Sequence, residues 1–97
     1  MLSTKLIMAQ LEKVKPQLQA QFHVNEIALF GSYARNEQTE NSDIDVMINL
    51  QPSSYINLCN TLYALQNLFP NQKVQIVSKK GIKPKYFEAI KNDLMYA

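Results

Sequence analysis

Cysteine is almost absent from this chain of 97 residues, and its scarcity excludes several kinds of site. Cys59 is the only cysteine, so neither an internal disulfide nor a metal site built from several cysteines can form. His23 is the only histidine, and it has no neighbour at the spacing of metal ligands. We therefore expect a structural or exposed role for His23.

Long apolar runs are missing as well. No run approaches the roughly 20 residues that a membrane-spanning helix needs. The N-terminal segment does not follow the signal-peptide pattern, because Glu12 and three lysines interrupt it. We therefore expect a cytoplasmic protein with no membrane partner. A hydrophobic content of 46% is typical of a globular protein, and the length predicts one domain over residues 1–97.

The net charge is only +2, and its distribution is more informative than its size. Residues 51–97 carry six lysines and two acidic residues, and four of these lysines lie within residues 79–85. This segment fits either a solvated loop or a basic patch facing a triphosphate, RNA or an acidic partner. Direct binding of nucleic acid is not expected, because no aromatic residues alternate with these lysines on a strand face.

The spacing of apolar residues predicts alternating helices and strands. We expect an α/β (α+β) fold with a small mixed β-sheet backed by helices. Pro16 either kinks the first helix or starts a second one. Cys59 lies on the apolar stripe of a later helix, so we expect its side chain to be buried. The expected elements are a helix from Ser3 or Thr4, a strand over 26–30, a short helix from Ser32, a strand over 43–50, a helix over 55–69, a strand over 74–77, a helix over 84–90 and an edge strand over 94–96.

Two aspartates open the second predicted strand. Residues two apart on a strand point to the same face, so Asp43 and Asp45 project together while Ile44, Val46 and Ile48 point into the core. Carboxylates held side by side repel each other unless a cation lies between them. The pair therefore predicts a site for Mg²⁺ or Mn²⁺, with nucleotide phosphates completing the ligand shell.

A glycine and a serine follow the first predicted strand. The first N–H groups of a helix starting at Ser32 have no partner within the helix and favour phosphate. Gly31 lets the backbone come close to a ligand, and the Ser32 hydroxyl can add a hydrogen bond. Arg35 can contact phosphate, brace the acidic cluster or form a surface salt bridge. The Ser42 hydroxyl can fix the entry of the second strand.

The motif Gly31-Ser32-Tyr33-Ala34-Arg35, followed after six residues by Ser42-Asp43-Ile44-Asp45, resembles the minimal nucleotidyltransferase (MNT) domain of the DNA polymerase β-like superfamily. The resemblance covers nearly the whole chain and implies the nucleotidyltransferase palm. It also implies transfer of a nucleoside monophosphate, AMP from ATP, to a hydroxyl group. Asp43 and Asp45 are then the catalytic metal ligands, and Gly31, Ser32, Arg35 and Ser42 bind the nucleotide.

One position departs from the family pattern. The family carries a third carboxylate on a later strand, whereas this chain has Val74-Gln75-Ile76-Val77. Gln75 is neutral and cannot act as a base near pH 7. We therefore expect weaker metal binding and slower activation of the acceptor hydroxyl, and three outcomes stay open: slow turnover, nucleotide binding without turnover, or a domain kept for binding another protein.

The resemblance also implies a partner. Similar MNT domains are commonly paired with a HEPN-domain RNase toxin, which the nucleotidyltransferase adenylylates on tyrosine or masks by binding. The predicted function is thus that of an antitoxin that modifies its partner; the alternative is a weakened or inactive module that neutralises its partner by binding alone. A homo-oligomer is compatible with both.

Overall fold

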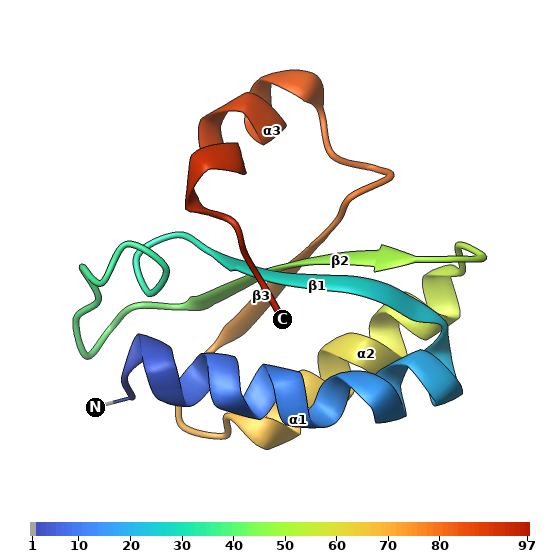
Figure 1. Cartoon of the computed structure of the whole chain (residues 1–97), viewed down its shortest axis with the longest axis horizontal. Coiled ribbons are helices and arrows are strands. Elements are labelled where there is room, and N and C mark those ends of the chain that lie inside the picture. The colour runs from blue at the N-terminus through green and yellow to red at the C-terminus, as the bar shows by residue number, and fades with distance from the viewer. Residues whose placement is uncertain (1) are drawn as a thin grey trace.

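The computed structural model describes residues 2–97. It consists of a mixed four-stranded sheet with helices on both faces (Figure 1). The strand order is β3-β2-β1-β4; β1 is antiparallel to β2 and β4, and β2 is parallel to β3. This confirms the predicted fold class. The elements are α1 (Thr4–Phe22), β1 (Val24–Phe30), β2 (Ile44–Leu50), α2 (Tyr55–Leu68), β3 (Val74–Ser78), α3 (Pro84–Ile90), a 3-10 turn (Lys91–Asp93) and β4 (Met95–Tyr96).

The first helix is one continuous element. Ser3 caps it, because its hydroxyl accepts a hydrogen bond of 3.1 Å from the N–H of Leu6. Pro16 lies within α1 and is exposed, so the carbonyl that loses its helical partner can bind water. The expectation that a second helix could start at Pro16 is therefore wrong. His23 ends the helix in the left-handed conformation, with φ of 63°.

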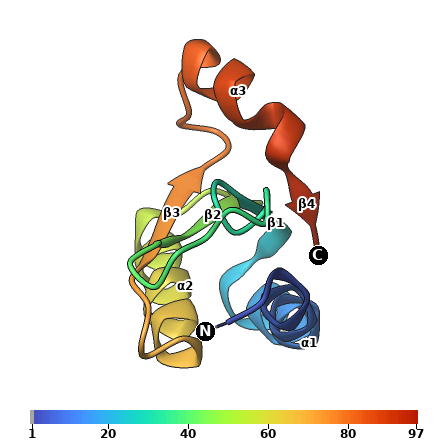
Figure 2. The same ribbon diagram turned by 90° about the vertical axis from the view of Figure 1, so that its left-hand side faces the viewer.

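The two faces of the sheet have different partners. Ile44, Val46 and Ile48 point toward α1 and α2 and join the main core, as their alternation in the sequence predicts. The other face carries a smaller apolar cluster that includes Phe30 and Met47 and packs under α3. Figure 2 shows α1 and α2 on one side of the sheet and α3 on the other. The sheet is therefore buried on one face and only partly covered on the face of α3.

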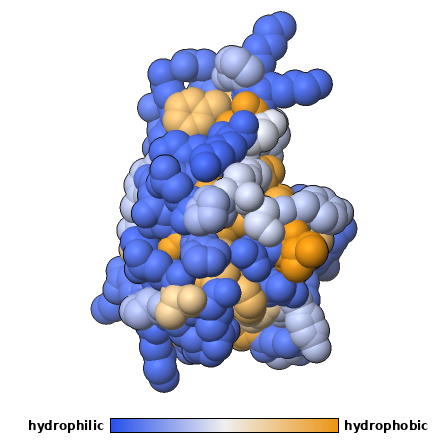
Figure 3. Space-filling view, turned by 90° about the vertical axis from the view of Figure 1, so that its right-hand side faces the viewer, coloured by the Kyte–Doolittle hydropathy of each residue, from blue (hydrophilic) through white to orange (hydrophobic). Residues whose placement is uncertain are grey.

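The outer side of α2 is exposed and uncharged. Tyr55, Ile56 and Tyr63 are 80%, 71% and 63% exposed, and the sequence of α2 contains no charged residue. Cys59 lies on the same side and is exposed, so the prediction that it is buried is wrong. It neighbours Leu58 on the helix, one position beyond the buried stripe. From the side where α2 begins, apolar side chains form small separate patches among polar ones (Figure 3).

Within residues 2–97, no helix combines the length and the apolar character that crossing a membrane requires.

Candidate active site

A tight turn connects the end of β1 to the loop before β2. Gly31 has φ of +79°, and its carbonyl accepts a hydrogen bond of 3.1 Å from the N–H of Arg35. The helix expected from Ser32 is only this single turn. Asn36 ends it in the left-handed conformation, which lets the N–H of Glu37 bond back to the carbonyl of Ser32 at 2.9 Å. The buried side chain of Tyr33 anchors the turn in the core.

The two aspartates lie together on the face of the sheet that α3 partly covers. Asp45 pairs in register with Phe30 on β1 and with Gln75 on β3. Paired residues point to the same face, so the amide of Gln75 lies beside these carboxylates. Its Nε2 donates a hydrogen bond of 2.9 Å to Oδ2 of Asp43, just before β2. The alternation predicted from the sequence therefore holds for the two carboxylates, and the pairing of β2 with β3 adds Gln75 to their cluster.

Gly31 lies directly against Asp45. A Cβ atom added to Gly31 would lie 2.3 Å from Oδ2 of Asp45, far inside van der Waals contact. Its positive φ is also strained for any residue with a side chain. The glycine therefore serves two purposes: it permits the sharp turn and lets the backbone touch the carboxylate.

Replacing Gly31 with alanine is expected to destabilise the protein by about 1–3 kcal/mol, through backbone strain and the clash with Asp45. Gly81→Ala is the matched control, because its added Cβ would stay 4.0 Å from Ser78. We expect that control to be neutral or stabilising by up to about 1 kcal/mol. Urea unfolding of both variants measures the difference, and equal stabilities would contradict the contact between Gly31 and Asp45.

Burial raises the pKa of Asp45, and the neighbouring charge of Asp43 raises it further. The positive charge of Arg35 opposes both effects. The folded state thus binds this proton more tightly than the unfolded state. The contribution of Asp45 to the free energy of unfolding is therefore most favourable below the ordinary carboxyl pKa of 3.8, where the side chain is protonated in both states. This contribution is lost as the pH rises from 3.8 through the raised pKa.

Metal-free Asp45→Asn protein is therefore expected to be more stable than the unsubstituted protein at pH 7. The advantage should shrink as the pH falls and vanish below the ordinary carboxyl pKa, because Asp45 is then neutral as well. Urea unfolding in the presence of a chelator, repeated across this pH range, measures the effect. A stability difference that stays constant with pH would show that the charge of Asp45 carries no cost.

The remaining predicted nucleotide ligands make local contacts. Arg35 forms salt bridges with Glu37 at 2.8 Å and with Asp93 at 2.7 Å, and these partners raise its pKa. The hydroxyl of Ser42 accepts a hydrogen bond of 2.9 Å from the N–H of Thr39 within the loop. These contacts hold the loop in shape, and the nucleotide-binding roles of Ser32, Arg35 and Ser42 stay predictions.

The donor set suits a divalent cation held by two carboxylates. Oxygen ligands of this kind are those that Mg²⁺ and Mn²⁺ prefer. In the part of the chain that the structure describes, no three or more His, Cys, Asp or Glu side chains gather to form a metal site. Gln75 explains this, because it lies where a third carboxylate would complete the cluster.

Tyr86 lies next to the site, although the sequence did not predict it there. The ring of Tyr86 on α3 packs edge-on against Phe30, with ring centroids 6.3 Å apart and an interplanar angle of 89°. Phe30 lies opposite Asp45, so this contact brings α3 next to the carboxylates. Nothing local marks Tyr86, because the contact joins residues far apart in the chain.

The model of the family "Polymerase beta, Nucleotidyltransferase" matches residues 12–95, which include the turn at Gly31, both aspartates and Gln75. The chain belongs to the polymerase β nucleotidyltransferase family. The resemblance that the sequence motif indicates is thereby confirmed. Since most of the described elements fall within the match, the nucleotidyltransferase fold accounts for the whole sheet and not for the motif alone.

Relatives within this nucleotidyltransferase family match the chain over nearly its whole length. A protein of Methanocaldococcus jannaschii, provisionally named a protein adenylyltransferase, is 42% identical over 88 residues, covering 89% of each chain. The protein adenylyltransferase MntA of Thermococcus cleftensis is 33% identical over 100 residues, covering 99% of this chain and 97% of the relative.

Solved structures show the same nucleotidyltransferase fold. One, provisionally described as a minimal nucleotidyltransferase, has a TM-score of 0.80 at 26% identity, covering 97% of this chain and 95% of its own. A mutant of the toxin–antitoxin MntA–HpeT has a TM-score of 0.65 at 18% identity, covering 98% of this chain and 71% of its own. The second likeness concerns the fold alone.

Proposed function

We propose that this chain is a metal-dependent nucleotidyltransferase that transfers AMP from ATP to a hydroxyl group of a partner protein. The observation that carries the proposal is the cluster of Asp43 and Asp45 against the backbone of Gly31. The names of the relatives support protein adenylylation as the reaction. We propose a HEPN-domain toxin as the partner, so that the chain acts as an antitoxin.

Each residue of the cluster has a definite part in this proposal. Asp43 and Asp45 hold Mg²⁺ or Mn²⁺, which supplies charge neutralisation and a lower pKa for the attacking hydroxyl. Gly31 brings the backbone close to the nucleotide, while Ser32, Arg35 and Ser42 contact its phosphates. The acceptor oxygen forms a bond to the α-phosphorus, the bond to the bridging oxygen breaks, pyrophosphate leaves and the hydroxyl proton passes to solvent.

Gln75 limits the expected rate. Its amide nitrogen donates to Asp43, so this carboxylate oxygen is already engaged by a neutral partner that a cation must displace. Gln75 also cannot accept the proton of the acceptor hydroxyl. The proposed activity is therefore slow by comparison with a site that has three carboxylates.

Incubation of the protein with α-labelled ATP, Mn²⁺ and the protein encoded next to it tests the proposal. We expect label on the partner, released as AMP by a phosphodiesterase, and no transfer when a chelator is present. Omission of the partner is the control. The absence of label under all these conditions, also in the variant Gln75→Asp, would count against an enzymatic function.

A second candidate function is neutralisation of the partner by binding alone. Two observations favour it: the neutral Gln75 beside Asp43, and the exposed uncharged side of α2. Exposed tyrosine and the absence of charge are typical of the centre of a protein interface. We propose that this side of α2 contacts the toxin.

Replacing Ile56 with aspartate is expected to weaken the complex with the partner about 10-fold or more, because it places a charge in the centre of this surface. Leu6→Asp is the matched control, because Leu6 is an exposed leucine on α1. Titration calorimetry measures both affinities, and light scattering of the free protein tests whether the surface instead joins two copies of this chain. Equal affinities of the two variants would exclude this contact.

A further inference from the structure

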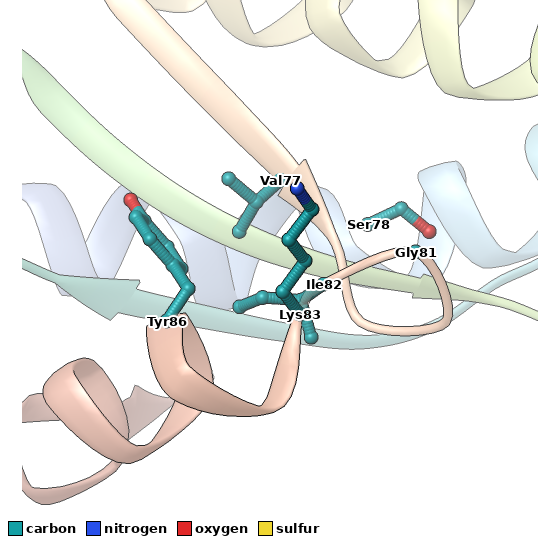
Figure 4. A pocket seen from close by; sticks show the side chains of 6 residues that line it. All are labelled: Val77, Ser78, Gly81, Ile82, Lys83 and Tyr86. Atoms are coloured by element: carbon teal, nitrogen blue, oxygen red, sulfur yellow. The ribbon is translucent and has the colours of Figure 1, made fainter.

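A pocket opens between the end of β3 and the start of α3 (Figure 4). Its volume is about 400 Å³, which lies within the range typical of small-molecule sites. Figure 4 shows the side chains of Lys83 and Tyr86 extending from the start of α3 toward the end of β3. The pocket is lined by Val77, Ser78, Gly81, Ile82, Lys83 and Tyr86.

The pocket adjoins the carboxylate cluster on the same face of the sheet. Val77 follows Gln75 by two residues on β3, which separates them by about 7 Å and points both side chains to one face. On the other side, Tyr86 packs against Phe30, which lies opposite Asp45. A molecule that reaches from the carboxylates along β3 therefore enters this pocket.

The lining combines apolar, aromatic and cationic groups. Val77 and Ile82 present aliphatic surface, and Tyr86, 46% exposed, presents an aromatic ring. Lys79 is engaged with Glu26 at 3.0 Å, whereas Lys83 takes part in none of the salt bridges found among residues 2–97. An aromatic ring beside a cation without an acidic partner suits a nucleotide, whose planar base can stack on the ring and whose phosphates are anionic.

We propose that this pocket holds the base of the nucleoside triphosphate, stacked on Tyr86 with Lys83 at its rim. The inference rests on the proposed nucleotidyl transfer and assigns a second part of the substrate to residues outside the motif. The other candidate occupant is the side chain of the acceptor residue. An uncharged acceptor such as tyrosine brings no counter-charge for Lys83, whereas a nucleotide brings both a planar base for Tyr86 and anionic phosphates for Lys83 at the rim, so the nucleotide fits the lining better.

Calorimetric titration with ATP and with inorganic tripolyphosphate, both with Mn²⁺, separates the base from the phosphates. We expect Tyr86→Ala to weaken ATP binding about 10-fold and to leave tripolyphosphate binding unchanged, because stacking on an aromatic ring is lost. Tyr86→Phe should retain the affinity for ATP. Tyr96→Ala is the matched control, since Tyr96 is about as exposed as Tyr86 and lies outside the pocket lining.

The outcomes distinguish this inference from the proposed function. If tripolyphosphate binds and depends on Asp43 and Asp45, while Tyr86→Ala leaves ATP binding unchanged, the pocket assignment alone is wrong. Unchanged ATP binding together with slower transfer to the partner would assign the pocket to the acceptor and overturn the inference in the same way. If neither ATP nor tripolyphosphate binds, both the inference and the proposed function fail.

A second measurement needs no substitution, in case Tyr86→Ala fails to fold. The methyl resonances of Val77 and Ile82 in the unsubstituted protein can be followed during titration with adenosine and, separately, with tripolyphosphate. We expect adenosine to shift these methyl signals and tripolyphosphate to leave them in place. Methyl signals that do not respond to adenosine up to millimolar concentration would overturn the inference.

Discussion

The double variant Asp43→Asn, Asp45→Asn is expected to lose nucleotidyl transfer by at least about 100-fold. A metal ion that stabilises transition-state charge contributes several kcal/mol, and each 1.36 kcal/mol or so is a factor of about ten in rate. Asparagine keeps the size of the side chain and removes the charge, so the sheet should stay intact while the cation site is lost. Initial rates of label transfer to the partner protein measure the effect.

A thermodynamic readout accompanies this loss. Ligand binding to the folded state alone raises stability, by about 2.7 kcal/mol at a hundred times the dissociation constant. Added Mn²⁺ should therefore stabilise the unsubstituted protein and leave the double variant unchanged. Glu40→Gln is the control, because it removes an exposed carboxylate from the loop before Asp43 and should respond to Mn²⁺ like the unsubstituted protein. Retained transfer in the double variant would remove the aspartates from the reaction.

Replacing Gln75 with aspartate is expected to increase the transfer rate about 100-fold. A positioned base contributes roughly 10²–10⁴-fold, and residue 75 already lies beside Asp45 in register and within hydrogen-bond distance of Asp43. The same change removes the hydrogen bond to Asp43 and adds a third negative charge. We therefore expect lower stability without metal and a larger stabilisation by Mn²⁺ than in the unsubstituted protein.

The control for this gain is Gln17→Asp, which adds the same charge on the exposed side of α1. It should change neither the rate nor the response to Mn²⁺. A Gln75→Asp protein that binds Mn²⁺ more tightly and still transfers no label would favour the second candidate, neutralisation by binding alone. A variant with unchanged Mn²⁺ affinity would show that residue 75 does not face the cation.

Features that depend on neighbouring residues could be predicted from the sequence. The alternation of Asp43 and Asp45 with Ile44 follows from the two-residue period of a strand, and the structure shows it. The cap at Ser3 and the helix start at Pro84 are likewise local, because each depends on groups within one turn.

Predictions failed where a short segment has two competing conformations or where burial depends on distant partners. The helix expected at Ser32 stops after one turn, because Asn36 adopts the left-handed conformation. Cys59 lies at the edge of the apolar stripe of α2, and its exposure depends on how α2 is turned against the sheet. Neither outcome follows from the spacing of apolar residues alone.

The sequence by itself determined the family, the alternating aspartates and the neutral residue at position 75, because these depend only on residue identity and spacing. Only the tertiary structure decided that Gln75 bonds Asp43, that Gly31 touches Asp45 and that Tyr86 lies beside Phe30. The reason is physical: each of these contacts joins different elements, and strand register and helix docking are set by the packing of the whole core.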